Sequence, residues 1–274
     1  MLVLLLSACS STRLAYDNLE RLVSWKSGDY VSLTRDQKRW LSGRVQTHRD
    51  WHCSTELPEY RRYLAQLQPQ LSSKALDADM LVDQLPEIQP AVDRLLEELA
   101  PTLAELLSDL TAQQVDELID NMQLQHQELH ERYVAPAEKV QNQERATRLE
   151  KRLTPWLGRL TAEQRQRVQS WSAELARQNS IWLDNRSFWL DNFISTLKQR
   201  DQPDFSERIN ALLTDRQQFW TPHFRERSEI NARLGAEMLA DLLSMASDRQ
   251  IQRMENRLAR LETDLQRMQC TAAT

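Results

Sequence analysis

Glycine is scarce in this chain, which has four glycines among 274 residues. Average usage of about 7% would give roughly five times as many. Phosphate-binding loops, dinucleotide fingerprints and nucleophile elbows need several glycines close together, because only glycine lets the backbone turn sharply or closely approach a ligand. The scattered glycines exclude such sites. They also argue against a β-sandwich or β-barrel, whose many turns consume glycine and proline. We therefore expect an all-α fold.

Basic residues do not outnumber acidic ones in this chain. The chain has 35 Lys and Arg against 40 Asp and Glu, a net charge of -5. A nucleic acid is therefore not an expected partner, since its binding relies on a basic surface. The sequence also lacks the glycine-turn or strand context of a nucleophile triad, a catalytic carboxylate pair or a cofactor-binding motif. We expect a protein that is not an enzyme and has no cofactor.

The N-terminus carries the strongest signal. An apolar run over residues 2–6 ends in Leu6-Ser7-Ala8-Cys9 and is followed by polar residues. This is a lipobox, which combines an apolar export segment, small residues that fit the peptidase, and a cysteine whose thiol receives the diacylglycerol. It predicts a lipoprotein signal peptide over residues 1–8, a palmitate-bearing Cys9, and a tether over residues 9–13. A complete signal peptide has about 15 to 30 residues and a positively charged start, so we expect further residues upstream.

The same segment predicts the location of the protein. No stretch reaches the roughly 20 apolar residues that span a bilayer, so the acyl chains on Cys9 are the expected membrane attachment. Ser10 rather than Asp follows the cysteine, which by analogy with bacterial lipoproteins favours the periplasmic face of the outer membrane. In that oxidising compartment Cys53 and Cys270 could form a disulfide or remain thiols with packing roles; the sequence leaves both possibilities open.

Apolar residues recur at helical spacing almost everywhere after Leu14. They predict an elongated multi-helix bundle with long C-terminal helices, forming one domain over residues 14–270 or two lobes that divide near residue 158. A stretch without glycine or proline from Thr161 to about Gln199 predicts one helix on the order of 55 Å long. Apolar residues at heptad spacing over 251–268 could form a coiled coil; they favour a helix packed in a bundle, because the seam is short.

A local repeat marks several expected helix starts. The pattern L-T-x-x-Q begins at Leu33, Leu110 and Leu160, and a looser copy begins at Ala246. It predicts a capping box, in which the Thr or Ser hydroxyl and the Gln side chain bond the free backbone N–H groups of the first turn. The pattern also resembles the signature motif of Spy-like periplasmic chaperones. That resemblance implies a helical protein that holds unfolded clients.

A wider resemblance covers the N-terminal third. The residues that carry it are Leu14-Ala15-Tyr16-Asp17-Asn18, Trp25, Asp29-Tyr30-Val31, Leu33-Thr34, Gln37, Trp51-His52 and Glu56-Leu57-Pro58. They resemble the opening of a family of proteobacterial lipoproteins catalogued as a domain of unknown function. The resemblance implies an all-helical periplasmic lipoprotein and no particular activity.

Two histidine pairs are the candidate metal or haem ligands. His48 and His52 stand one helical turn apart, as do His126 and His130. Residues at i and i+4 project from one helix face, which is how helices present metal ligands. The sequence lacks H-E-x-x-H at these positions, and three of the four histidines lie on or beside apolar stripes. Hydrogen-bonded core histidines are the alternative.

Eight tryptophans are many for this length. Trp171, Trp182 and Trp189 would share a face of one long helix, since their spacings are close to whole numbers of turns. Such a face either fills the core or forms an exposed groove for an apolar client or partner helix. We expect charged runs such as 144–152 and 249–260 to be solvated faces with ion pairs at i and i+4. Together these features predict a membrane-anchored protein that binds envelope proteins or apolar clients.

Overall fold

The computed structural model of the chain describes residues 15–72, 76–175 and 177–268. Every regular element in these ranges is a helix, which confirms the all-α prediction. Residues 1–14, including the lipobox, lie outside the described ranges. Within those ranges, none of the helices combines the length and the apolar composition that a membrane span requires.

The first half of the chain contains seven elements. These are α2 (Leu19–Ser27), α3 (Arg35–Trp51), the π-helix η2 (His52–Glu56), α4 (Leu57–Ser72), α5 (Ala78–Asp83), α6 (Leu85–Ser108) and α7 (Ala112–Tyr133). The second half contains another seven. These are α8 (Glu138–Leu157), α9 (Ala162–Glu174), α10 (Gln178–Leu197), α11 (Phe205–Thr214), the 3-10 helix η3 (Arg216–Phe219), α12 (Pro222–Ser244) and α13 (Asp248–Arg267).

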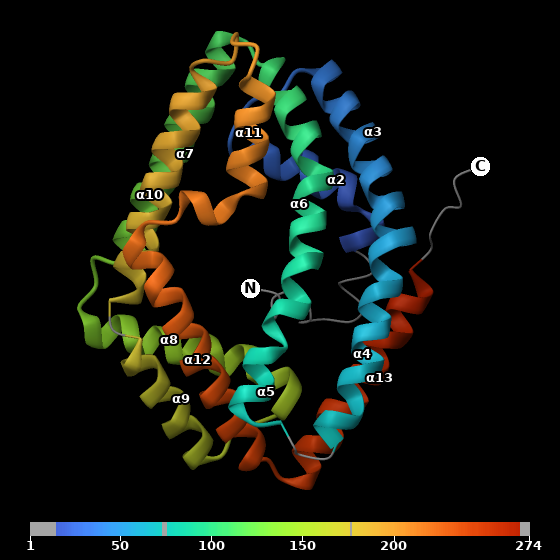
Figure 1. Cartoon of the computed structure of the whole chain (residues 1–274), viewed down its shortest axis with the longest axis vertical. Coiled ribbons are helices and arrows are strands. Elements are labelled where there is room, and N and C mark those ends of the chain that lie inside the picture. The colour runs from blue at the N-terminus through green and yellow to red at the C-terminus, as the bar shows by residue number, and fades with distance from the viewer. Residues whose placement is uncertain (1–14, 73–75, 176, 269–274) are drawn as a thin grey trace.

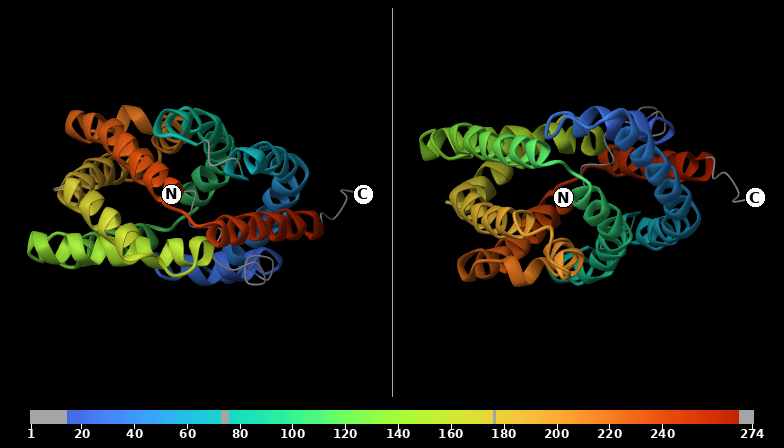
Figure 2. Two further views of the ribbon diagram at one scale, coloured as in Figure 1. Left: turned by 90° about the horizontal axis from the view of Figure 1, so that it is seen from below. Right: turned by 90° about the horizontal axis from the view of Figure 1, so that it is seen from above.

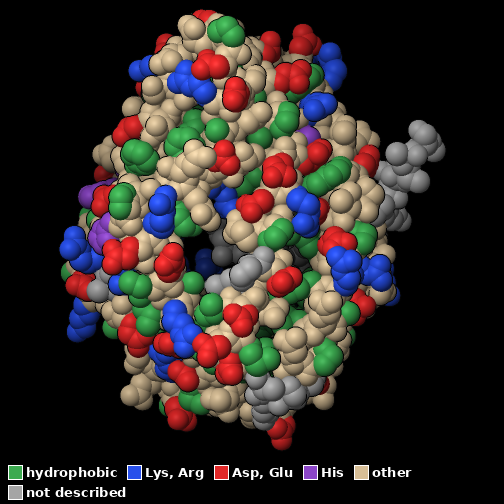
Figure 3. Space-filling model, viewed as in Figure 1, with side chains coloured by type: hydrophobic (Ala, Val, Ile, Leu, Met, Phe, Trp, Pro, Cys, Tyr) green, Lys and Arg blue, Asp and Glu red, His purple; other side chains and the backbone are tan. Residues whose placement is uncertain are grey.

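The helices form an elongated ring around an opening (Figures 1 and 3). Helix α6 lies on one side of the opening, and α10 and α12 lie on the other. The ring is closed where α11 packs on α6 and α12 packs on α5. Two ion pairs lie at these junctions: Arg216 of η3 pairs with Asp93 of α6 at 3.0 Å, and Arg233 of α12 pairs with Asp79 of α5. In depth, α2, α8 and α13 lie on one side of the molecule and α6 and α11 on the other (Figure 2).

All four predicted capping boxes are present. The side chains of Thr34, Thr111, Thr161 and Ser247 each accept a hydrogen bond from the backbone N–H of the glutamine three residues later. That glutamine in turn accepts one from the N–H of the capping residue. The boxes begin α3, α7, α9 and α13. They satisfy backbone donors that a helix start otherwise leaves without partners.

The four glutamines also pair with one another. Gln37 and Gln114 exchange side-chain amide hydrogen bonds of 3.3 and 2.8 Å, and Gln164 and Gln250 exchange two of 3.2 and 3.1 Å. The apolar residue that opens each motif is buried beside its pair. The repeated motif therefore does more than start helices, because it joins α3 to α7 and α9 to α13.

Two large apolar clusters form the core. The first draws on α3, α6, α7, α10 and α11, and the second on α8, α9, α12 and α13. Residue 158 does not separate them, since Leu157 and Leu160 belong to the same second cluster. Helices α10 and α11, from the second half of the chain, complete the first cluster. A third, small cluster joins Cys53 and Leu57 to Met268.

The prediction of a single long helix over residues 161–199 is wrong, because the structure has two helices there. The chain leaves helical geometry after Glu174, and Arg177 takes a left-handed conformation with φ 60° before α10 begins. A buried arginine holds this break. Arg145 of α8 donates to the carbonyl of Ser172 at 2.7 Å and to the side chain of Asn179 at 3.2 Å, one residue on each side of the break.

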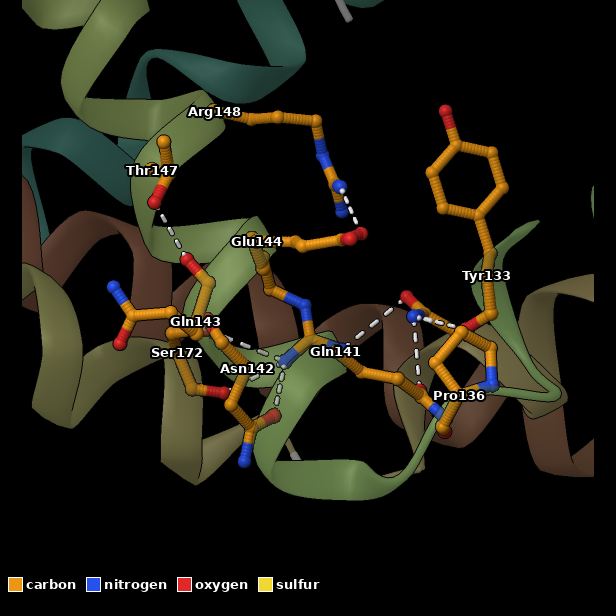
Figure 4. A network of polar contacts seen from close by, with 11 residues as sticks. Tyr133, Pro136, Gln141, Asn142, Gln143, Glu144, Thr147, Arg148 and Ser172 are labelled. Atoms are coloured by element: carbon orange, nitrogen blue, oxygen red, sulfur yellow. Dashed lines mark hydrogen bonds and ion pairs between the residues drawn. The ribbon is translucent and has the colours of Figure 1, made fainter.

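A wider polar network supports the same break (Figure 4). The hydroxyl of Ser172 donates to the carbonyl of Asn142 at 2.7 Å, and Gln141 donates to the carbonyls of Val134 and Pro136. Burial lowers the pKa of Arg145 below its usual range, and the nearby positive charge of Arg148 adds to the effect. Tertiary contacts thus override a sequence that has no helix-breaking residue.

The heptad-spaced segment folds as expected into a packed bundle helix. Ile251, Met254, Leu258 and Leu261 are buried, and α13 packs against α4 and α8. The prediction of a bundle helix rather than a separate coiled coil is therefore confirmed.

Candidate functional site

His48 lies in a polar seam between α3 and α6. Its Nδ1 is 2.8 Å from Oε1 of Glu98, and its Nε2 is 2.7 Å from Oγ1 of Thr102. The same Thr102 oxygen accepts hydrogen bonds from Arg44. Because both ring nitrogens already contact protein groups and the side chain is buried, His48 has the surroundings of a hydrogen-bonded core histidine.

His52 begins the π-helix and contacts two tyrosines. The hydroxyl of Tyr16 donates to the carbonyl of Arg49 at 3.1 Å and lies 3.2 Å from Nδ1 of His52. The Tyr60 ring meets the imidazole edge to face, with centroids 5.5 Å apart. Burial lowers the pKa of His52 and raises the pKa of Tyr16 to about 12. Here too the imidazole contributes to packing.

An ion pair between a buried carboxylate and a partly exposed arginine fixes the end of the π-helix. Glu56 is fully buried, and Arg94 of α6 donates to its two carboxylate oxygens at 2.7 and 2.9 Å. Such two-point pairing is strong and directional. The sequence patterns did not predict the π-helix. Its one signal is Pro58, which has no N–H to continue the regular hydrogen-bond ladder.

The second histidine pair lies elsewhere, on α7. His126 is half-buried, and its Nδ1 has no hydrogen-bond partner among the described residues. Burial is the main cause that lowers its pKa, and the nearby Arg186 of α10 adds to the effect. His130 is exposed. The described ranges contain no group of three or more His, Cys, Asp or Glu side chains arranged to hold a metal. The structure therefore does not gather the four histidines into one centre.

The third cluster brings the two ends of the described chain together. Cys53 is disulfide-bonded, and it packs with Leu57 and Met268 beside Tyr16 and Leu265. Cys9 and Cys270, the other two cysteines, lie outside the described residues. Met268 precedes Cys270 by two positions, so the location of Cys53 is consistent with a Cys53–Cys270 bond, which stays a prediction.

The expected tryptophan face is divided and mostly used in packing. Trp171 lies on α9, before the break, and contacts the second core cluster. On α10, Trp182 meets Tyr133 edge to face at 6.3 Å, and Trp189 stacks on Phe193 at 5.2 Å. The Trp189 Nε1–H donates to the carbonyl of Leu212 at 3.0 Å. The shared-face prediction is wrong, because the three rings lie on two helices.

Exposed apolar side chains are instead concentrated on α2. Among the side chains whose exposure the structure describes, two large apolar ones are exposed on α2 and at most one on each other helix: on α2 these are Trp25 at 70% and Leu22 at 40%, one turn apart. The others lie singly on six different helices. These are Met80, Leu103, Leu124, Val140, Phe188 and Ile230.

An arginine-rich recess on α13 was not expected from the sequence. It measures about 410 Å³ and is lined by Arg249, Gln252, Arg253, Asn256 and Arg260. The expectation of ion pairs at i and i+4 holds for Glu144 and Arg148, at 3.3 Å. It is wrong for the recess. No carboxylate of the described residues lies within 4.0 Å of the guanidinium groups that line it.

Comparison with known proteins gives a family but no function. No curated protein and no solved structure matches the chain. One family model, described as a family of unknown function (DUF6279), matches residues 29–225. Because this match covers more than half of the chain, the protein belongs to the DUF6279 family of unknown function.

Proposed function

We propose that this protein is a lipoprotein anchored through Cys9 at the periplasmic face of the outer membrane, and that it acts by binding other envelope proteins rather than by catalysis. The observation that carries the proposal is the sequence Leu6-Ser7-Ala8-Cys9, followed by Ser10. Acyl chains anchor a protein through the burial of many methylene groups, each contributing about 0.8 kcal/mol.

The packing of Tyr16 supports this proposal. Tyr16 packs on the third cluster and hydrogen-bonds to the carbonyl of Arg49, and it lies seven residues after Cys9 in the sequence. Seven extended residues span at most about 25 Å. A lipid on Cys9 would therefore hold the helical body close to the bilayer surface.

The α2 helix offers the surface for protein contact. Trp25 and Leu22 form an apolar face one turn long, and α2 begins at Leu19, six residues after the tether ends at position 13. Tryptophan is enriched among the residues that dominate binding energy at protein interfaces, because its large ring buries area with little loss of conformational freedom. We propose that this α2 face contacts an envelope protein or an apolar client segment.

Cell fractionation tests the anchor. The Cys9→Ala variant should move from the membrane fraction to the soluble periplasm and lose radiolabelled palmitate, whereas the matched Ser11→Ala variant should behave like the parent protein. Ser10→Asp should shift the protein from the outer to the inner membrane. Retention of Cys9→Ala in the outer membrane would refute the lipid anchor.

Site-specific photocrosslinking in cells tests the contact surface. A photoreactive amino acid at position 25 should give a discrete crosslinked band with an envelope protein. The same probe at position 124 is the matched control, since Leu124 is 54% exposed but lies alone on α7. Equal crosslinking at both positions would argue against a specific role for α2.

A chaperone activity is the sharper form of the same proposal. Its motivation is the repeated L-T-x-x-Q motif, which the sequence shares with Spy-like chaperones. The purified protein should suppress aggregation of an unfolded client without ATP. Failure to do so at equimolar concentration would remove the chaperone role and leave the anchored binding protein.

A further inference from the structure

The arginine stripe of α13 consists of Arg249, Arg253 and Arg260. With Asn256 between them, the residues are spaced by four, three and four positions, so they project from one face of the helix. All three side chains are exposed, and the opposite face of α13 is buried in the second cluster. The recess that they line is open to solvent and wholly polar in its side chains.

The charges of the stripe remain available to a ligand. Arg253 donates through Nε to the carbonyl of Pro155 at 3.3 Å, which leaves the rest of its guanidinium group for other contacts. Arg249 and Arg260 take part in none of the ion pairs of the described chain. Like charges spaced by four residues repel each other and weaken a helix. The chain as a whole is acidic, so general basicity does not explain the stripe.

The stripe also lies near the expected membrane anchor. Tyr16, the second described residue, packs beside Leu265 in the third cluster. Arg260 precedes Leu265 by five residues, which is about 7.5 Å along a helix. The tether before Tyr16 reaches about 25 Å at most. Helices α2 and α13 occupy the same side of the molecule (Figure 2). A bilayer that holds Cys9 would thus be within reach of α13.

We propose that the arginine stripe of α13 binds the phosphate groups of anionic phospholipids at the membrane surface that holds the acyl chains of Cys9. The location rests on the proposed lipid anchor, but the binding chemistry does not need the acyl chains. Guanidinium groups donate paired hydrogen bonds to phosphate oxygens, and several of them near an anionic bilayer add their attractions. The stripe would fix how the body lies on the membrane.

Vesicle co-sedimentation tests the proposal with the full chain carrying Cys9→Ala, so that no acyl chain contributes. Vesicles of phosphatidylcholine mixed with phosphatidylglycerol supply phosphate with net negative charge. Vesicles of phosphatidylcholine alone report any binding through the apolar residues 2–6. The test variant is Arg249→Gln/Arg253→Gln/Arg260→Gln. The matched control is Arg35→Gln/Lys38→Gln/Arg39→Gln, which removes three exposed charges at the start of α3, at the opposite end of the ring (Figure 1).

The parent protein should bind the anionic vesicles, and the affinity should fall as salt rises. The α13 triple variant should bind them about 100-fold more weakly, whereas the α3 control should bind them no more than about threefold more weakly. The α13 variant should keep its circular dichroism and melting temperature, because the replaced side chains are exposed. Equal loss in both triple variants, or equal binding to neutral vesicles, would overturn the proposal.

Two further outcomes distinguish lipid binding by the stripe from binding of a free anion and from the acyl anchor. Saturable binding of inorganic phosphate by calorimetry, without preference for anionic vesicles, would assign the recess to a free anion and overturn the lipid assignment. Retention of Cys9→Ala in the outer membrane of cells, with release only when the α13 triple change is added, would remove the acyl anchor while supporting the stripe. The two proposals therefore fail in distinguishable ways.

Discussion

The two glutamine pairs have the same bonds in different surroundings. In the first pair, Gln37 also donates to the carbonyl and the carboxylate of Asp109, and Gln114 donates to the carbonyl of Ser32. Asp109 and Ser32 are exposed, so water can reach the edge of this pair. In the second pair, Gln164 is fully buried, and its further acceptor is the carbonyl of the buried Leu242 at 3.4 Å.

The difference shows that one local motif can have two energetic roles. The first pair sits beside the larger apolar cluster, which α10 and α11 complete. Its amide bonds can be exchanged for bonds to water when one partner is lost. In the second pair Gln164 is fully buried beside the smaller cluster, so a group that loses its bond to Gln164 meets no water on that side. The second region should therefore depend more strongly on its glutamines than the first.

Replacing one glutamine in each pair is expected to give the largest effect. Gln164→Ala should lower the free energy of unfolding by about 3–4 kcal/mol, because it leaves a cavity and deprives both Gln250 and the Thr161 N–H of a partner. Gln37→Ala should cost only about 1–2 kcal/mol, since water can bond the groups left behind. Urea denaturation followed by circular dichroism measures both values.

The exposed Gln123→Ala on α7 is the control for loss of a glutamine from a helix surface and should change stability by less than about 0.5 kcal/mol. Equal costs for Gln37→Ala and Gln164→Ala would show that burial does not distinguish the two pairs. A double-mutant cycle between Gln164 and Gln250 should give a coupling energy of at least about 1 kcal/mol.

The disulfide of Cys53 is expected to have the next largest effect, because it would tie the first region to the end of the second. Cys53→Ala should lower the free energy of unfolding by about 2–4 kcal/mol. Mass spectrometry of a non-reduced digest should show a peptide that contains Cys53 linked to Cys270. A link between Cys53 and Cys9 would contradict both this pairing and the lipid anchor.

The capping hydroxyls should show no such difference between regions. Thr34→Ala and Thr161→Ala should each cost about 1 kcal/mol, because each removes one hydrogen bond to the first turn of a helix. Asn or Asp at either position should restore most of the loss, as both are good capping residues. If Thr161→Ala cost as much as Gln164→Ala, the motif would act through its cap and not through the buried amide pair.

The sequence predicts the helix starts, which depend on residues close together in the chain, but not the contacts between distant helices. Each capping box forms between two residues three positions apart, so Thr34, Thr111, Thr161 and Ser247 could be assigned without a structure. The pairing of Gln37 with Gln114 joins positions 77 residues apart and depends on the packing of whole helices. The break at Arg177 could not be predicted from the sequence for the same reason, because Arg145 stabilises it from another helix.

For the candidate sites too, the sequence gives the spacing of residues along a helix but not their partners on other helices. Spacing alone placed His48 and His52 on one helix face, but the partners that occupy His48 come from α6. The arginine stripe had a signal that could have been used: Arg249, Arg253 and Arg260 are spaced by four and seven positions, which places like charges on one helix face, where a solvated face usually alternates its charges. What the sequence does not contain is the nearness of α13 to Tyr16, which arises from tertiary packing.

Acid should weaken the surroundings of the third cluster through His52, whose ring contacts Tyr16 and Tyr60. Burial lowers the pKa of His52 from its usual 6.5, so below about pH 6.5 the unfolded chain takes up a proton that the folded chain does not. The stabilising contribution is present above this pH and is lost as pH falls, by at most about 1.4 kcal/mol per pH unit. His52→Gln should therefore show a flatter decline of unfolding free energy between pH 7.5 and about 5.5 than the parent protein.

His223→Gln is the matched control for this pH dependence, because His223 is exposed at the start of α12 and far along the chain from the π-helix. Its unfolding free energy should follow that of the parent protein at each pH. A decline that is equally steep in His52→Gln and in the parent would assign the acid sensitivity to other groups.

The smallest effect is expected at Trp25, even though tryptophan is the largest side chain. Trp25 is 70% exposed and lies outside the apolar clusters of the described chain, so Trp25→Ala should change the free energy of unfolding by no more than about 0.5 kcal/mol. Trp189→Ala, which removes a stacked ring and its hydrogen bond to Leu212, should cost about 3 kcal/mol or more. If photocrosslinking from position 25 also captures a partner, a side chain that contributes almost nothing to folding has a function in binding. A large loss of stability in Trp25→Ala would instead show that α2 uses this ring in its own packing and would withdraw it as a contact surface.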